Sequence, residues 1–453
     1  MFLPARPSIS PGEKPARSSI TCAAVMSLTT GACVDANMAE HKTVQNPSTK
    51  AHSARRHSQI VRVCCLIHEA AANDGPVAYA DAVVFALSIH ADYKCHQSGI
   101  CCTSDWDVPV EVPLYRSLTD AIEAGHVSPA ALAEEGYPTF IVEPDLPDSA
   151  AAMVGRTSSG NCVFFHSRSG LCVIHRDLGE PRLPSTCRHF PRIAVRDRRG
   201  TFISLTHYCP TAAGMLFRED VPVAIVENPA AFPLADYEGL TVDPEAWPPL
   251  LHPDMLMDLE GYTAWERHMV ARCALELSPE SVIGTLARDA RVLRTYEPAS
   301  GSLVAAVQNL PGGLVDLPGE LSLEASLVLH AEVLKAVPED VRPEPDDAGL
   351  EEAFIRLVVP EWDRWHAPLR KFLAAKAFAN WTAYQGRGVL SIIRGLEAAL
   401  AFVRIEAARE CRNADRPLDA ALLKQAFRGT EFVLNHLAVG EDLAEGWSKV
   451  ENA

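Results

Sequence analysis

Seven cysteines crowded into about a quarter of the chain are the feature that most constrains its fold. The chain has 453 residues and thirteen cysteines. Seven of these cysteines are Cys95, Cys101, Cys102, Cys162, Cys172, Cys187 and Cys209. A packed core needs far fewer thiols, whereas thiolates gathered in one place are a common means of holding a metal. We therefore expect the seven side chains to converge on a metal site that organises this part of the chain.

The number of thiols leaves more than one kind of centre open. Structural zinc takes four ligands in a tetrahedron, and a cubane iron–sulfur cluster also takes about four thiolates. Seven candidates therefore suit one iron–sulfur cluster with spare thiols, most simply a 4Fe–4S cluster, or a binuclear zinc site. Side chains of neighbouring residues diverge, so Cys101 and Cys102 can face different partners. Disulfides are a weaker alternative, because the cysteine count is odd and the chain is large. Unlinked buried thiols are weaker still, because Cys95, Cys101 and Cys102 lie in a polar, glycine-containing turn where burial has no obvious purpose.

Other cysteines and the nearby histidines receive simpler interpretations. Five histidines lie beside the seven cysteines in sequence, and a surface or supporting role is favoured over direct ligation for each. They are His96, His166, His175, His189 and His207. Cys273 and Cys411 fall on apolar faces of predicted helices and are interpreted as small buried hydrophobic residues. The four that precede position 90 are interpreted as ordinary thiols, namely Cys22, Cys33, Cys64 and Cys65.

Composition and charge narrow the class of protein. Apolar residues make up 48% and charged residues 22% of the chain, as in ordinary soluble proteins. The formal charge of −17 argues against nucleic acid as a partner, because phosphate backbones would be repelled. No apolar run approaches the roughly eighteen residues of a membrane span, so we expect no membrane insertion. The stretch from Ile20 to Leu28 only loosely imitates a signal peptide, and the expected location is a reducing compartment, the cytoplasm.

Shifts in composition divide the chain into five predicted parts. A Ser-, Thr- and Pro-rich start lacks any sustained period and predicts disorder, whereas the region from 254 onward has helical spacing of its apolar residues. The parts are a disordered tail over 1–58, leader elements over 59–90, a cysteine-cluster metal-binding domain over 91–217, a Pro-rich connector over 218–253 and a helical domain over 254–440. The predicted fold class is mainly α with minor β, a loop-rich cysteine domain followed by an all-α helical bundle.

Local signals place several elements within these parts. Val108 to Val112 predicts an extended edge segment, because proline is tolerated at a sheet edge. Ser128-Pro129 predicts the start of a short helix, and Asp254 is the expected cap of a helix that runs to Cys273. Ser278-Pro279 predicts a helix to about Leu293. Further helices are predicted over 321–336, 353–359, 368–384, 389–412 and 418–437.

Several motifs resemble those of a known family. They are Asn161-Cys162-Val163-Phe164-Phe165, Gly170-Leu171-Cys172-Val173-Ile174, Leu183-Pro184-Ser185-Thr186-Cys187-Arg188-His189-Phe190-Pro191-Arg192, Cys101-Cys102 followed by Trp106, and Tyr208-Cys209-Pro210-Thr211-Ala212. Together they resemble the zinc- or iron-chelating CxxCxxCC domain, and within it the flagellin lysine N-methylase family. The resemblance covers about 91–217 closely, and 250–437 loosely through Lys376 to Gly386.

The resemblance implies an activity that the residues do not show by themselves. It implies methyl transfer from S-adenosylmethionine to a lysine ε-amine of a protein substrate such as flagellin, with an iron–sulfur or zinc centre involved. The family's first element normally has a further cysteine between Cys95 and Cys101, which this chain lacks. We find no glycine-rich nucleotide fingerprint and cannot name a catalytic base. Glu180 is a candidate carboxylate, and a salt bridge with Arg188 or Arg192 is an equal interpretation of it.

Two other functions remain open beside the methyltransferase. One is a non-catalytic metalloprotein, in which the metal organises a small domain and the helices bind a partner protein. The other is a metal-handling or redox-sensing protein whose spare thiols react. All three share the metal-binding prediction.

Overall fold

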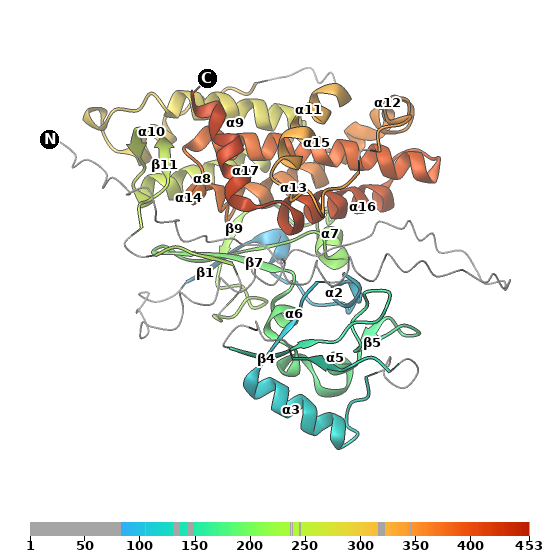
Figure 1. The fold of residues 1–453 in the computed structure, drawn as a ribbon. Coiled ribbons are helices and arrows are strands. Elements are labelled where there is room, and N and C mark those ends of the chain that lie inside the picture. Colours follow the sequence, from blue (N-terminus) through green and yellow to red (C-terminus); the bar gives the residue numbers. More distant parts are fainter. Residues whose placement is uncertain are drawn as a thin grey trace.

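A mixed five-stranded sheet lies between a helical layer and a smaller lobe (Figure 1). This lobe carries most of the nine cysteines that the structure describes. The computed structural model describes residues 83–452, except 105, 130–135, 143–145, 147–148, 236, 238, 244–245, 316–321 and 345. The strand order is β10-β7-β8-β1-β9. The strands are β1 (Val84–Leu87), β7 (Arg192–Asp197), β8 (Gly200–Leu205), β9 (Ile225–Glu227) and β10 (Gly239–Thr241).

The sheet is assembled around one hairpin. Strands β7 and β8 pair antiparallel from Arg192 opposite Leu205 to Asp197 opposite Gly200. Strand β1 then joins β8 in parallel, and β10 joins β7 in parallel. Gly200 has a φ of 138°, and a Cβ there would lie 2.5 Å from the carbonyl oxygen of Val83. Glycine is therefore required where β1 meets the hairpin.

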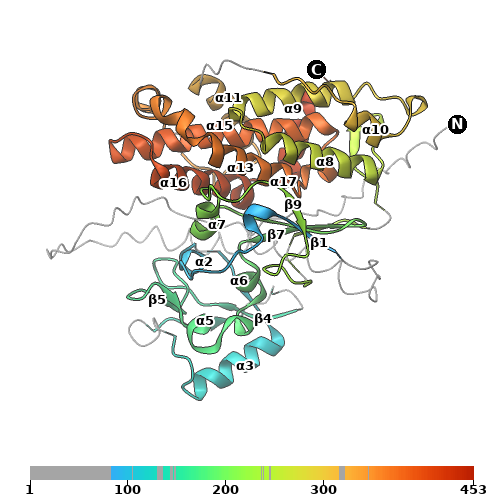
Figure 2. The ribbon, with the colours of Figure 1, turned by 180° about the vertical axis from the view of Figure 1, so that it is seen from behind.

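The lobe below the sheet consists of short elements (Figures 1 and 2). Its sheets are β2-β4-β3 and β5-β6. The strands are β2 (Pro109–Glu111), β3 (Phe140–Ile141), β4 (Ala150–Val154), β5 (Phe165–His166) and β6 (Leu171–Cys172). The helices are α2 (Ile100–Thr103), α3 (Val112–Glu123), α5 (Val173–Leu178), η4 (Glu180–Arg182) and α6 (Ser185–His189). The extended segment predicted around Val110 is confirmed, and β2 is an edge strand, where its proline is tolerated.

The helical layer is built around α15 (Val389–Ala414), a 26-residue helix with a largely buried surface. Two short segments, η3 (Ser88–His90) and α7 (Pro210–Met215), lie beside the sheet. The hairpin β11 (Leu250–His252) and β12 (Met255–Leu256) leads into the helices. The other helical elements are α8 (Leu259–Cys273), α9 (Pro279–Leu293), η5 (Pro298–Ser300), α10 (Leu303–Gln308), α11 (Leu323–Leu334), α12 (Leu350–Ala353), η6 (Phe354–Val358), η7 (Val359–Trp365), α13 (His366–Ala377), α14 (Thr382–Gln385), α16 (Ala420–Glu431), η8 (Phe432–Leu437), α17 (Gly440–Trp447) and η9 (Ser448–Asn452).

The predicted fold class, mainly α with a loop-rich cysteine domain, is wrong. The structure is mixed α/β, with about 51% helix and 12% strand in several sheets. All the described strands have only two to six residues, which is too short to display a clear alternation of apolar and polar residues. The parallel pairs β1-β8 and β7-β10 also join segments far apart in sequence, and local patterns carry no signal for such pairing. Two strands of the main sheet, β9 and β10, come from the segment interpreted as a connector.

Helices α8 and α9 each begin directly after a residue whose side chain caps the helix. Ser278 caps α9 by accepting a hydrogen bond from the amide of Ser281, so the predicted start is confirmed. Asp254 does not cap α8: it lies in the turn of the β11-β12 hairpin, and Asp258 accepts the hydrogen bond from Gly261 instead. The helix predicted over 368–384 is divided into α13 and α14 at residues 378–381.

Some predictions fall on residues outside the described part. These are the tail over 1–58, the leader up to residue 82 and most of the helix predicted after Ser128. In the described part of the chain, no helix has both the length and the apolar character needed to cross a membrane.

Candidate metal centre

Five of the seven predicted thiols form an inner group in the lobe. Cys101 and Cys102 lie on α2, Cys162 follows β4, Cys172 ends β6 and Cys187 lies on α6. The thiol of Cys102 is in hydrogen-bond contact with those of Cys101, Cys162 and Cys172, and Cys187 interacts electrostatically with the same three. The amide of Cys162 donates to the carbonyl of Cys102 over 2.7 Å, which holds two of the segments together.

Cys95 and Cys209 form an outer pair at the other end of the site. Cys209 is the residue before α7, and its sulfur lies 3.8 Å from the hydroxyl of Tyr93. Cys95 is exposed in the loop before α2, where its sulfur accepts a hydrogen bond from the amide of Gln97 over 3.3 Å. Cys95 interacts electrostatically with both Cys101 and Cys209, so it links the outer pair to the inner group.

A cavity of about 50 Å³ separates the two groups. Six of the seven thiols line it, and Cys162 lies outside its wall. Gly99 allows the close packing at this wall, because it has a φ of 74° and a Cβ there would lie 2.7 Å from the ring of Phe165. The cavity has room for roughly four water molecules, so it can accommodate an ion or part of a small cluster.

The thiols differ in how readily they ionise. The hydrogen bond from Cys102 lowers the pKa of Cys172 to about 7 and also lowers the pKa of Cys162, in both cases against the opposing effect of burial. The hydrogen bonds that Cys102 makes to Cys101, Cys162 and Cys172 raise its own pKa. Burial raises the pKa of Cys187 well above its usual value and raises that of Cys95. Cys162 and Cys172 are therefore the thiols best prepared to ionise first.

Cationic side chains surround the thiols of this acidic protein. The guanidinium of Arg156 donates to the carbonyl oxygens of Cys102 and Trp106, and its charge helps to lower the pKa of Cys162. Arg192 lines the cavity, lies 5.4 Å from the centre of the Tyr93 ring, and has a buried Nε without a hydrogen-bond partner. These positive charges favour thiolates at the site.

Unlike the thiols, most of the five candidate histidines lie away from the cavity. Of the five, only His175 lines the cavity, together with Glu180, whose side chain is exposed. His96 is exposed, and the ring of His166 is hydrogen-bonded to Ser169. His189 packs against Tyr237, and His207 is buried against Phe372 of α13. His175 is thus the one candidate histidine at the cavity, and the other candidate ligands there are thiols.

The side chains around the cavity are of the right chemical type to bind a metal as thiolates, but they are not spaced as ligands. Thiolates select zinc and iron–sulfur clusters. In the described residues, however, no three Cys, His, Asp or Glu side chains already stand in a metal-ligating arrangement. The inner thiols instead hydrogen-bond to one another. Loss of their protons and small rotations about Cys χ1 would convert these hydrogen-bonded thiols into ligands.

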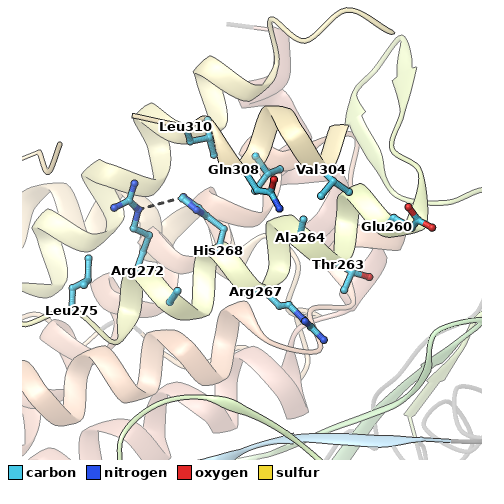
Figure 3. Close-up of a pocket in the computed structure, with 12 residues that line it drawn as sticks. Glu260, Thr263, Ala264, Arg267, His268, Arg272, Leu275, Val304, Gln308 and Leu310 are labelled. Carbon is cyan, nitrogen blue, oxygen red and sulfur yellow. Dashed lines mark hydrogen bonds between the residues drawn. The ribbon is translucent and has the colours of Figure 1, made fainter. Parts of the chain in front are cut away.

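Two further features were not found from the sequence. One is a buried polar cluster in which Glu431 lies between Lys376 and His207, with His90 beside His207. Its members come from four distant segments, and no local signal marks them. The other is an open groove of about 680 Å³ beside α8 and α10. Figure 3 shows Val304 and Gln308 of α10 facing Ala264 and His268 of α8.

That groove is larger than the thiol-lined cavity, but it lacks the thiols on which the metal-binding prediction rests. Two of its polar side chains are paired: Arg272 donates to His268, and both contact the buried carboxylate of Asp289. No cysteine lines the groove. The thiol-lined cavity, although smaller, is therefore the better candidate for the functional site.

Comparisons with known proteins identify no relative of this chain. No family model, no curated protein and no solved structure matches this chain.

Proposed function

We propose that this protein holds a metal through cysteine thiolates, as an iron–sulfur cluster, most simply 4Fe–4S, or as zinc. The observation that carries the proposal is the gathering of five thiols from four separate segments between residues 101 and 187. Four of them are in hydrogen-bond contact, and the fifth, Cys187, interacts electrostatically with three of these. A core without a ligand has no need to bring these thiols together, and unlinked thiols contribute only as small hydrophobic groups. All nine described cysteines are free, which supports a reducing, cytoplasmic location.

The inner group would supply the ligands. Cys162 and Cys172 would bind first, because their pKa values are lowered, and Cys101, Cys102 and Cys187 are the other candidates. Such a centre supplies electron-transfer chemistry as an iron–sulfur cluster or Lewis-acid chemistry as zinc. The chain itself encloses the site and provides the compensating charge of Arg156 and Arg192.

Anaerobic purification followed by metal and acid-labile sulfide analysis tests this proposal. We expect stoichiometric iron and sulfide with a brown colour, or stoichiometric zinc without colour. Cys187→Ser should lose most of the metal. Cys273→Ser, which alters a buried thiol of α8 far from the site in sequence, should keep it. Wild-type protein without metal, or full metal in Cys187→Ser, would contradict the ligand assignment.

For the activity of this centre we propose methyl transfer to a protein lysine, supported by the family resemblance. The methyl group would pass from the sulfonium of S-adenosylmethionine to the ε-nitrogen of the lysine. S-adenosylhomocysteine would leave and the amine would release a proton. Glu180 is the carboxylate of the cavity wall that could accept this proton. The protein substrate would be flagellin or a protein of similar kind.

Binding and turnover separate this activity from a non-catalytic role. Metal-loaded protein should bind S-adenosylmethionine in calorimetry and transfer a labelled methyl group to purified flagellin. Glu180→Gln should slow the transfer while the metal content stays unchanged. Absence of S-adenosylmethionine binding by the metal-loaded protein would remove the methyltransferase proposal and leave a metal-organised interaction module or a redox sensor.

A further inference from the structure

A second cavity lies between the sheet and the helical layer. It has a volume of about 70 Å³, and its wall is formed by the ends of β7 and β8, the turn between α13 and α14, α15, η8 and α17. Ile193 lines it, whereas the preceding residue, Arg192, lines the thiol cavity. Neighbouring side chains of a strand point to opposite faces, so the two cavities lie on opposite faces of β7. The second cavity is thus a separate site.

A fixed ammonium group stands at the wall of this second cavity. Nζ of Lys376 lies 2.5 Å from a carboxylate oxygen of Glu431, which is completely buried. Thr206 donates to the other oxygen over 3.2 Å, Asn435 also donates to it, and His207 lies 3.6 Å from the first. The Lys376 side chain is 18% exposed and lines the cavity. Glu431 therefore holds the ammonium in place while the remaining N–H donors of Lys376 stay available.

This ion pair is hard to explain by stability alone. A buried ion pair contributes little net stability compared with a well-packed apolar pair, because both charges must be desolvated. Burial opposes ionisation of Glu431, but the charge of Lys376 and the hydrogen bond with His207 outweigh it and lower the pKa of the carboxyl to about 2. Buried charged groups that face a cavity are candidates for a functional site.

The neighbouring turn is held in a strained conformation. Ala379, which lines the cavity, has a φ of 52°, in the left-handed region that a non-glycine residue rarely adopts. Its amide donates to the buried carboxylate of Glu266 over 3.1 Å, which fixes the turn. Strain of this kind persists where surrounding structure imposes it, often at binding sites.

Two tryptophans form the aromatic part of the wall. Trp381 and Trp447 both line the cavity, and their ring centres lie 6.4 Å apart. Two glycines leave room for them: a Cβ at Gly395 would lie 3.0 Å from the ring of Trp447, and one at Gly440 would lie 3.1 Å from that of Trp381. The wall thus joins flat aromatic surface to one ammonium group, and planar molecules pack well on such surfaces.

We propose that this cavity binds a small planar aromatic carboxylate, with its carboxylate on Lys376 and its ring against Trp381 and Trp447. The ammonium is the charge nearest to the ligand, and Coulomb energy falls with distance, so its attraction exceeds the repulsion from Glu431 behind it. The volume admits roughly five water molecules, which limits the occupant to about one substituted ring. The cavity and its residues are independent of the thiols.

Fluorine NMR with 4-fluorobenzoate tests the site directly. Addition of wild-type protein should broaden the ligand signal in a saturable way. The neutral 4-fluorobenzamide should bind about tenfold more weakly, because it lacks the charge that Lys376 recognises. Cyclohexanecarboxylate should compete poorly, because it lacks the flat ring. Equal binding of the acid and the amide, or no binding of the acid, would overturn the proposal.

Variants assign the binding to this cavity. Lys376→Met should weaken 4-fluorobenzoate binding at least about tenfold, and Trp447→Leu about fivefold. The double variant Lys376→Met/Glu431→Gln removes both charges and guards against unfolding caused by an unpaired carboxylate. Lys449→Met changes an exposed lysine that does not line the cavity and should bind like the wild type. Unchanged binding in the folded double variant would overturn the assignment, whatever the metal content.

Discussion

At the scale of single residues, burial decides the charge of several ionisable groups. His330 on α11 is 7% exposed, and its ring lies 4.6 Å from that of Phe402. Burial, with a smaller contribution from the charge of Arg409, lowers the pKa of His330 to about 4. The folded protein therefore keeps this imidazole neutral at a pH where an unfolded chain would protonate it.

This shift predicts an acid-sensitive part of the stability. Below pH 6.5 the unfolded state binds a proton at His330 that the folded state does not, so the free energy of unfolding falls until the pH reaches about 4. His330→Phe should remove up to about 3 kcal/mol of this loss, measured by urea unfolding at pH 7 and pH 4.5. His126→Phe, at an exposed position after α3, should keep the wild-type slope. An identical slope in the two variants would contradict the assignment.

At the scale of elements, a hydrogen bond and not the sequence pattern alone decides where a helix begins. Two aspartates precede α8, and both are plausible caps by residue type. The turn of the β11-β12 hairpin occupies Asp254, so the helix begins only after Asp258, whose side chain accepts from the amide of Gly261. The short hairpin therefore displaces the start by one helical turn.

The two aspartates form a matched pair for experiment. Asp258→Ala should lower the free energy of unfolding by about 1 kcal/mol, because one amide at the start of α8 loses its partner. Asp254→Ala should change it by less than about 0.5 kcal/mol, because its exposed side chain caps no helix. Chemical denaturation of both variants under the same conditions measures the difference. The reverse order would show that the helix begins at the earlier residue.

At the scale of the whole molecule, aromatic contacts join the cysteine lobe to the helical layer. Trp106 of the lobe is 4% exposed. Its ring lies 5.0 Å from that of Phe190 and 5.6 Å from that of His436 on η8. Tyr208, next to Cys209, packs against the same histidine at 5.3 Å. The candidate metal centre is thereby coupled by packing to the helices above the sheet (Figure 2).

Loss of this contact should loosen the lobe. Trp106→Ala should lower the free energy of unfolding by about 3–5 kcal/mol, because a large buried ring leaves a cavity. Limited proteolysis should then cut within residues 95–190 earlier than in the wild type. Trp247→Ala, at a ring that is 68% exposed, should change neither measurement appreciably. Equal protection of the lobe in both variants would show that Trp106 does not join the two parts.

Sequence patterns were enough to predict that the thiols gather and where many of the helices lie. The crowding of cysteines predicted their convergence, because so many thiols have few other uses. The structure brings four of the seven into hydrogen-bond contact, and Cys187 interacts electrostatically with three of these. Helix α9 followed from Ser278-Pro279, since capping depends on neighbouring residues only. Cys273 and Cys411 are buried in helices, as their apolar surroundings predicted.

The sheet and the second cavity depend on contacts between distant segments. Strands of a few residues carry little periodicity, and the parallel pairing of β1 with β8 joins residues more than a hundred positions apart. The cluster of Lys376, Glu431, His207 and His90 likewise joins four distant segments. Local sequence reports residue type and local geometry, but contacts between distant segments depend on packing of the whole chain. For that reason the gathering of the thiols was predictable, whereas the α/β fold that positions them was not.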